Sequence, residues 1–179
     1  RMSQQTAVEL SERCRAAALS VPQECRDRFI ELICSKRKIF IYGVGRSGLI
    51  GQLFAVRLVQ IGFDVYFVGD MTTPIIGKDD LTILISNTGH TASVVQTGDI
   101  ARRVGSHVVA LTSARTGKLT NVANTSIVMS LGRDYSDIAP LGTMFEDSAL
   151  LFLDSLVPDI MGKVGVTEDD MRRNHAIWV

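Results

Sequence analysis

Two short polar segments of the chain have residue types and spacing that suit the binding of a phosphate group. They are Gly43 to Gly48, which reads Gly-Val-Gly-Arg-Ser-Gly, and Ser86 to Thr91, which reads Ser-Asn-Thr-Gly-His-Thr. Each follows an apolar run and precedes an amphipathic stretch, so each is expected where a strand ends and a helix begins. Backbone N–H groups at a helix start attract anions, and glycines let the backbone approach a ligand closely. The sequence therefore predicts an anion site at two strand-to-helix turns.

In the first segment the candidate binding residues are Gly45, Arg46 and Ser47. Arg46 supplies a charged donor for a phosphate or a sugar hydroxyl. Two other interpretations stay open. Ser47 fits a plain helix N-cap. The spacing Gly-x-Gly-x-x-Gly, with Asp70 after the next apolar run, also fits the turn of a dinucleotide-dependent oxidoreductase, in which the acid would hold a ribose.

The second segment separates these hypotheses, because a dinucleotide fold does not need a Ser/Thr-rich turn there. Its candidate binding residues are Ser86, Asn87, Thr88, Gly89 and Thr91. An ordinary N-cap at Thr88 or Thr91 would account for one hydroxyl, but not for three within six residues. Several hydroxyl and backbone donors around one turn are typical of a site for a phosphate monoester.

The elements that must position these segments follow from the hydrophobic pattern. Apolar residues at helical spacing up to Ser35 predict two helices before the first strand. Continuous apolar runs predict five strands covered on both faces, at 39–42, 65–68, 81–85, 108–111 and 127–131. Helices are predicted at 47–61, 91–104, 115–124 and 143–161, the last ending or bending near Pro158, whereas 69–80 is predicted to be a loop. Alternating strands and helices predict a parallel sheet in an α/β fold.

Composition limits the classes of function. The chain has 179 residues, and its 19 Lys and Arg balance its 19 Asp and Glu. This balance gives no indication of a nucleic-acid or membrane-surface protein, and no apolar run is long enough to cross a bilayer. The three cysteines form no C-x-x-C pair, which favours a reducing, cytoplasmic compartment. No Cys, His and carboxylate cluster has the spacing of a zinc site, so no metal is expected.

With these residues in view, the chain resembles the sugar isomerase (SIS) domain family, and within it the 6-phospho-3-hexuloisomerases. The resemblance covers residues 38–154. It rests on Ile41 to Gly48, Thr72 to Pro74, Asp79 to Leu81, Ser86 to Thr91 and Pro140 to Glu146. It implies a flavodoxin-like, three-layer α/β/α fold with a five-stranded parallel sheet. We therefore expect one SIS domain over 1–179, with N-terminal helices at 1–36, an α/β core at 37–161 and a C-terminal tail at 162–179.

The resemblance also implies a reaction and a site. Members of this group interconvert 3-hexulose 6-phosphate and fructose 6-phosphate through a cis-enediol, as homotetramers and with no metal or redox cofactor. The implied partner is thus a phosphorylated sugar, with no nucleic acid and no membrane. Glu146 matches the catalytic base, and His175 matches a group that opens the sugar ring or shuttles a proton, contributed by a neighbouring subunit. Around His175 the chain departs from the family pattern, with Asn174 in place of Arg and Ile177 in place of Asn.

Alternatives remain for both catalytic candidates. Thr143 to Glu146 also matches a helix capping box, in which the glutamate only caps the helix start. His175 lies near a chain end, where side chains are commonly solvated. A non-catalytic phosphosugar sensor would keep Ser47, Ser86, Thr88 and Thr91 but would need neither Glu146 nor His175.

Overall fold

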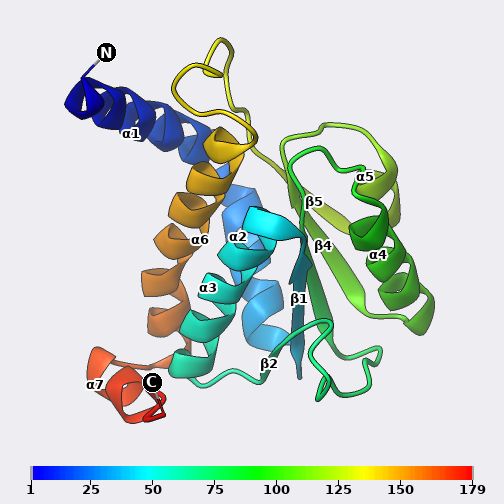
Figure 1. Ribbon diagram of the computed structural model, residues 1–179. Coiled ribbons are helices and arrows are strands. Elements are labelled where there is room, and N and C mark those ends of the chain that lie inside the picture. The colour runs from blue at the N-terminus through cyan, green and yellow to red at the C-terminus, as the bar shows by residue number, and fades with distance from the viewer. Residues whose placement is uncertain (1, 179) are drawn as a thin grey trace.

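A five-stranded parallel sheet forms the centre of the protein, and the computed structural model describes residues 2–178 around it (Figure 1). The strand order is β2-β1-β3-β4-β5, and every adjacent pair is parallel. The strands are β1 (Ile39–Gly43), β2 (Val65–Phe67), β3 (Leu81–Ile85), β4 (His107–Thr112) and β5 (Thr125–Val128). The helices are α1 (Ser3–Leu19), α2 (Gln23–Ser35), α3 (Gly45–Ile61), α4 (Ala92–Val104), α5 (Lys118–Val122), α6 (Thr143–Val164) and α7 (Glu168–Arg173). The predicted α/β fold with two helices before the first strand is confirmed.

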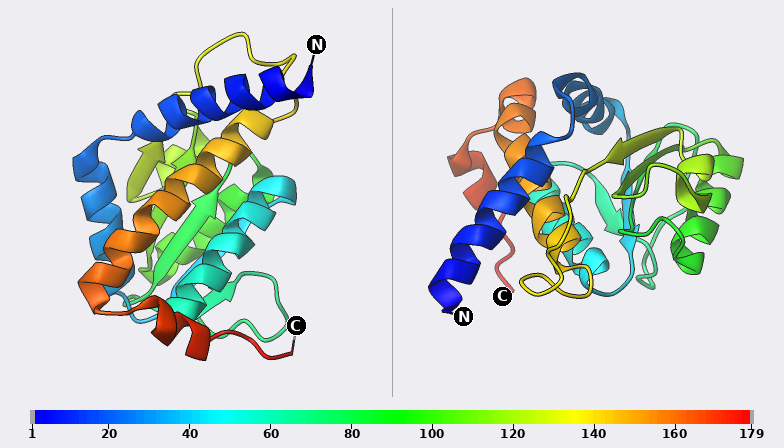
Figure 2. Two further views of the ribbon diagram at one scale, coloured as in Figure 1. Left: turned by 90° about the vertical axis from the view of Figure 1, so that its left-hand side faces the viewer. Right: turned by 90° about the horizontal axis from the view of Figure 1, so that it is seen from above.

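The helices cover the two faces of the sheet unequally. One face packs against α3, α6 and the N-terminal helices, and the other packs against α4 and α5 (Figures 1 and 2). On the first face, Phe29 stacks with Phe54 and Phe152 at ring-centroid distances of 6.5 and 6.4 Å, which ties α2, α3 and α6 into one core. The continuous apolar run of β3 is buried at all five positions, as expected for a strand covered on both faces.

Two elements, the fifth strand and the last long helix, have boundaries that differ from the sequence-based expectation for identifiable reasons. The fifth strand was predicted at 127–131 but occupies Thr125–Val128, because an edge strand accepts polar residues that a search for apolar runs passes over. The last long helix continues through Pro158 to Val164, so the predicted boundary after residue 161 is wrong. Proline removes a single backbone donor, and the buried side chains of Leu156 and Ile160 hold the helix together on either side of it.

The predicted C-terminal tail contains a further helix. Thr167 caps α7 by accepting a hydrogen bond from the backbone of Asp170, and the Asp170 carboxylate accepts one from the backbone of Thr167. This reciprocal capping box holds the carboxylate in its charged form, and the pKa of Asp170 is accordingly lowered, chiefly by its hydrogen bonds to Thr167. The sequence pattern Thr-x-x-Asp at 167–170 carried this signal and was overlooked.

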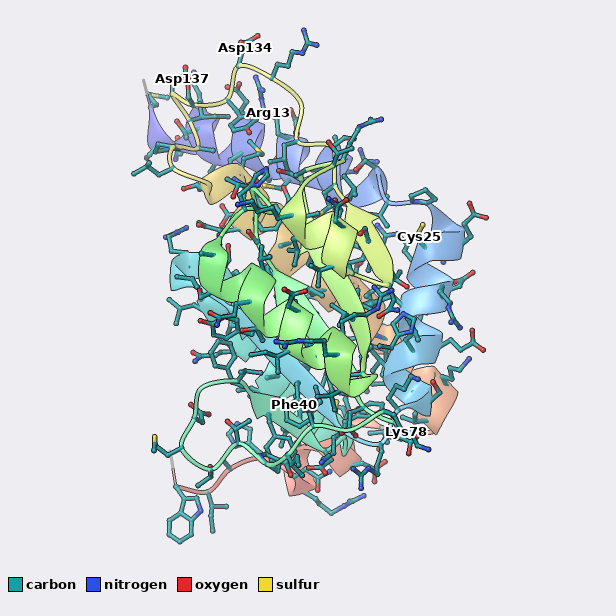
Figure 3. The ribbon with its side chains drawn as sticks, turned by 90° about the vertical axis from the view of Figure 1, so that its right-hand side faces the viewer. Arg13, Cys25, Phe40, Lys78, Asp134 and Asp137 are labelled. Carbon is teal, nitrogen blue, oxygen red and sulfur yellow. The ribbon has the colours of Figure 1, made fainter. Side chains whose placement is uncertain are left out.

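The loop predicted at 69–80 is confirmed, and it covers part of the α4 side of the sheet. Its Ile76 packs with Tyr42 against the apolar cluster under α4. Its far end is anchored by Asp80, which is fully buried and accepts hydrogen bonds from the backbone N–H groups of Lys38 and Gly77. Figure 3 shows this side of the molecule, with Phe40 of β1 and Lys78 of the loop labelled.

The half-buried imidazole of His107, at the start of β4, is expected to make folding stability depend on pH. Its Nε2 lies 2.8 Å from the Thr125 hydroxyl, and its pKa is lowered from 6.5, first by burial and then by the positive charges of Lys36, Arg28 and Arg102. As the pH falls below that ordinary value, the unfolded chain takes up a proton that the folded chain resists, so the free energy of unfolding must fall. His107→Gln should lose less stability than the parent protein between about pH 7.5 and pH 5 in urea unfolding. Equal losses would contradict this assignment.

Candidate functional site

The candidate site lies at the carboxyl ends of β1 and β3, two adjacent strands whose following helices pack on opposite faces of the sheet. The chain leaves the carboxyl end of β1 into α3 on one face of the sheet, and leaves β3 into α4 on the other face. Adjacent parallel strands whose connections diverge in this way leave a crevice between them, which is the usual ligand site of open α/β sheets. Both polar segments singled out in the sequence therefore open onto one crevice.

In the first of these turns, two glycines let the backbone pack against itself. A β-carbon on Gly48 would lie 2.5 Å from the carbonyl oxygen of Gly43, so no other residue fits there. Gly45, with φ of +59°, adopts the left-handed conformation that glycine tolerates. Helix α3 begins at Gly45 with Val44 in the N-cap position, and the interpretation of Ser47 as the N-cap is therefore wrong. Arg46 and Ser47 both lie in the first turn of α3.

In the second turn, the side chains brace one another around a tight backbone loop. The hydroxyls of Ser86 and Thr91 are 3.2 Å apart, and the Ser86 hydroxyl also accepts a hydrogen bond from the backbone of Gly89. The backbone of His90 donates to the Thr88 hydroxyl. Thr91 occupies the N-cap position of α4 but makes no capping hydrogen bond with its side chain. A simple capping role for its hydroxyl is therefore wrong, and this hydroxyl belongs to the loop.

Glu146 is positioned by the start of α6. It is buried, and its Oε2 accepts a hydrogen bond from Nε of Arg46, which lies across the crevice on α3. The side chain of Arg46 is 62% exposed against 9% for Glu146, so the pair joins a buried carboxylate to a solvent-facing cation. Hydrogen bonding to Glu146 raises the pKa of Arg46. The predicted site residues of α3 and α6 thus meet, although 100 positions separate them in the chain.

The capping-box interpretation of Thr143 to Glu146 is wrong. The N-cap position of α6 is Gly142, no side chain makes a capping hydrogen bond there, and the Glu146 carboxylate is bonded to Arg46 instead. The helix start is fixed by packing, because Met144 is buried beside Cys14 of α1. The preceding segment also lies against α1, where Arg13 donates a hydrogen bond of 2.6 Å to the carbonyl of Arg133 (Figure 3).

Asn87 lies beside the glutamate. A β-carbon built on Gly142 would be 3.3 Å from Oε1 of Glu146 and 3.7 Å from Nδ2 of Asn87, so both side chains border the space above this glycine. Gly142 has a φ of +88°, which other residues rarely adopt, and its missing side chain leaves that space open. The amide nitrogen of Asn87 and the carboxylate of Glu146 therefore border one space.

Sequence reasoning missed the residues that hold Asn87. At the end of β4, Thr112 Oγ1 donates to the Asn87 carbonyl at 3.0 Å, and Ser113 Oγ lies 2.9 Å from that carbonyl and 2.5 Å from the side-chain Oδ1. A signal was present, because Thr112 and Ser113 end the strand next to β3, and the carboxyl ends of parallel strands share one edge of the sheet.

His175 lies at the opposite end of α3 from the other predicted site residues (Figure 1). The adjacent Asn174 donates a 3.1 Å hydrogen bond to the carbonyl of Gln60, near the C-terminal end of α3. Arg46 and Gln60 are separated by about 20 Å of helix at 1.5 Å per residue. There His175 lines a groove of about 480 Å³ together with Asp70 and one face of α3. Within one chain, the structure does not bring His175 to Glu146.

The described residues hold neither a metal cluster nor a helix fit to span a membrane. Between residues 2 and 178, no three His, Cys, Asp or Glu side chains are grouped so that they could bind a metal ion. Over the same residues, no helix is both long enough and apolar enough to cross a bilayer.

Comparison with known proteins identifies the family. The sequence profile described as the SIS domain matches residues 31–146, a range that contains both turns and ends at Glu146. The chain belongs to the SIS domain family. The SIS match does not extend to His175, so the role of the tail rests on the more detailed resemblance alone.

Several relatives of the chain share the name 3-hexulose-6-phosphate isomerase. The chain is 40% identical to the 3-hexulose-6-phosphate isomerase of Methanocaldococcus jannaschii over 149 residues, which are 83% of this chain and 81% of the relative. It is 32% identical to the enzyme of that name from Bacillus subtilis, with 94% of each chain covered. A crystal structure of a Methanococcus jannaschii protein, described as inferring the function of 3-hexulose-6-phosphate isomerase, superposes with a TM-score of 0.86 at 36% identity, covering 95% of this chain and 97% of that one. The predicted resemblance to this branch of the SIS family is confirmed.

Proposed function

We propose that the protein is a phosphosugar isomerase that interconverts 3-hexulose 6-phosphate and fructose 6-phosphate. The observation that carries the proposal is the buried carboxylate of Glu146, which borders one space with the amide of Asn87 from the turn rich in hydroxyl and backbone donors. The names of the SIS relatives support the choice of sugar.

The reaction moves a carbonyl between adjacent carbons, and this requires one base that serves both carbons. Glu146 removes the proton from C2 of the hexulose, a cis-enediol forms, and the same carboxyl returns a proton to C3. The hydroxyl proton on O2 passes to O3, so hydrogen and charge balance without a redox cofactor. The phosphate is held at Ser86 to Thr91 and at the first turn of α3, where Gly45 and Ser47 lie.

Arg46 connects the two parts of this site. In the free protein it is bonded to Glu146. Because its side chain is mostly exposed, it is free to move to an oxygen of the bound sugar phosphate. Substrate binding would then release the Glu146 carboxylate for proton transfer.

The hydroxyl of Thr91 gives a direct test of the phosphate site. Thr91→Val keeps the shape of the side chain but removes a donor from the loop, and the affinity for inorganic phosphate should fall about tenfold or more. Isothermal titration calorimetry with phosphate measures the effect. Thr97→Val is the matched control, because the Thr97 hydroxyl donates to the Ser93 carbonyl within α4. Equal phosphate affinities of the two variants would remove Thr91 from the site.

We further propose that the enzyme works as a homotetramer in the cytoplasm. An exposed apolar stripe on α3, formed by Leu49, Leu53, Val56 and Val59, offers a surface for a second subunit. The same arrangement would let His175 of one subunit reach the crevice of its neighbour. The three free cysteines fit a reducing compartment.

A phosphosugar sensor is the second candidate, and conversion of substrate distinguishes it from the enzyme. A sensor needs the phosphate loop but has no use for a buried carboxylate facing the bound sugar. The test is to incubate the protein with 3-hexulose 6-phosphate and measure fructose 6-phosphate. Binding without conversion, seen as a higher melting temperature, would favour the sensor. The dinucleotide hypothesis gains no support, since Asp70 lies in the groove beside His175.

A further inference from the structure

The side chain of Asn87 makes contacts that differ from those of its neighbours in the polar turn. Ser86 and Thr88, its neighbours in the polar turn, use their hydroxyls to accept hydrogen bonds within that loop. The Asn87 amide instead borders the space above Gly142, where the Glu146 carboxylate also lies. The amide nitrogen of Asn87 thus borders the same space as the carboxylate assigned to proton transfer.

The contacts of the amide also fix which of its ends faces that space. Oδ1 lies 2.5 Å from the Ser113 hydroxyl, and Nδ2 lies on the side of Gly142 and Glu146. The reverse orientation would turn the amide oxygen toward the space that the Glu146 carboxylate borders, and two acceptors that share a space repel each other. A hydrogen-bond donor therefore stands beside the base.

We propose that Asn87 is a further catalytic residue, whose Nδ2–H donates a hydrogen bond to the substrate oxygen that becomes negatively charged, and that Ser113 is its positioning residue. The inference rests on the proposed isomerase function. When Glu146 takes the C2 proton, the C–H electron pair forms the C2–C3 double bond, and the carbonyl electrons move onto O3. Nδ2 stabilises that oxygen without giving up its proton. A fixed donor at this point stabilises the transition state more than the ground state.

This geometry also explains the open space at Gly142. Base and donor must reach neighbouring parts of the substrate, the base at the C2–H and the donor at O3, the carbonyl oxygen on the adjacent carbon C3. A side chain at position 142 would contact both groups and fill the volume between them. The glycine thus keeps open the place where C2, C3 and O3 of the substrate have to lie.

The test compares Asn87→Asp, Asn87→Ala and two Ser113 variants in the full-length protein. Loss of one such donor lowers kcat about a hundredfold or more, so both Asn87 variants should show this fall, with KM for the sugar phosphate changed far less. Ser113→Ala should lower kcat about tenfold with little change in KM, and Ser113→Thr, which keeps the hydroxyl, should restore it. Asn121→Asp, the same change on an exposed position of α5, should have wild-type kinetics.

Binding measurements give a second readout that does not depend on turnover. A phosphorylated sugar hydroxamate, which mimics the enediolate, should lose affinity for the Asn87 variants by a similar factor, while inorganic phosphate should bind as in the wild type. If the wild type is active and the kcat of Asn87→Asp is within about threefold of the wild-type kcat, the role of Asn87 is overturned while the proposed isomerase function stands. Loss of phosphate and hydroxamate affinity in parallel would also overturn it, by returning Asn87 to the phosphate loop. A wild type that does not convert 3-hexulose 6-phosphate would overturn the proposed function, and this inference with it.

Discussion

Glu146→Gln is expected to abolish isomerase activity while leaving the fold intact. The amide has nearly the shape of the carboxylate and still offers an oxygen to Arg46, so the contact between α3 and α6 is kept. It has no basic site that could take a proton from carbon, and the loss of a positioned base lowers kcat about a thousandfold. Steady-state turnover of 3-hexulose 6-phosphate measures the effect, and a thermal melt reports on the fold.

Glu31→Gln is the matched control for this variant. It makes the same change on the exposed surface of α2, where Glu31 pairs with Arg28 at 3.3 Å, and it should turn over substrate as the wild type does. Near-normal turnover by a folded Glu146→Gln protein would remove Glu146 from catalysis. It would leave the Arg46 contact as the structural role of this glutamate.

His175→Ala is expected to lower kcat about a hundredfold or more, through loss of a proton-transferring group. His175 and Glu146 lie at opposite ends of α3 in one chain, so our proposal places the histidine in the site of a neighbouring subunit. Co-expression of His175→Ala with Glu146→Gln should therefore restore activity. In a symmetric assembly that mixes at random, about one quarter of the sites would combine an intact glutamate with an intact histidine.

The mixed assembly has clear controls. Each variant expressed alone should be inactive, and native mass spectrometry should detect oligomers that contain both chains. Mixed oligomers that remain inactive would contradict the shared site. Full activity of His175→Ala alone would show that the tail has no part in the chemistry.

The sequence predicted those parts of the fold that depend on local pattern. The apolar run at 81–85 specifies β3 to the residue, because this strand is buried on both faces. The edge strand β5 begins two residues before its predicted start, because Thr125 and Ser126 pair through their backbone and not through apolar burial. The passage of α6 through Pro158 depends on tertiary packing, which local pattern does not encode.

In the candidate site, too, the features that depend on local sequence could be predicted and those that depend on distant residues could not. The two polar turns, which we propose bind phosphate, could be found from the sequence because each lies between a strand end and a helix start that are adjacent in the chain. The partners that set the roles of individual residues are distant in sequence. Arg46 is bonded to Glu146, and Ser113 holds Asn87 from the end of the neighbouring strand. Local pattern thus left open, as an alternative role for Glu146, a capping box that the structure does not contain, and it grouped Asn87 with the phosphate donors.

Proton exchange at carbon tests the central claim most directly. Incubating fructose 6-phosphate with the protein in heavy water and following its C–H signals by nuclear magnetic resonance reports the step assigned to Glu146, with no supply of the hexulose. The account predicts that deuterium replaces hydrogen at C3, that C1 retains its hydrogens, and that Glu146→Gln exchanges neither position. Exchange at C1 would show an aldose–ketose isomerase instead. Absence of exchange at every carbon, with the sugar phosphate bound, would contradict the isomerase assignment.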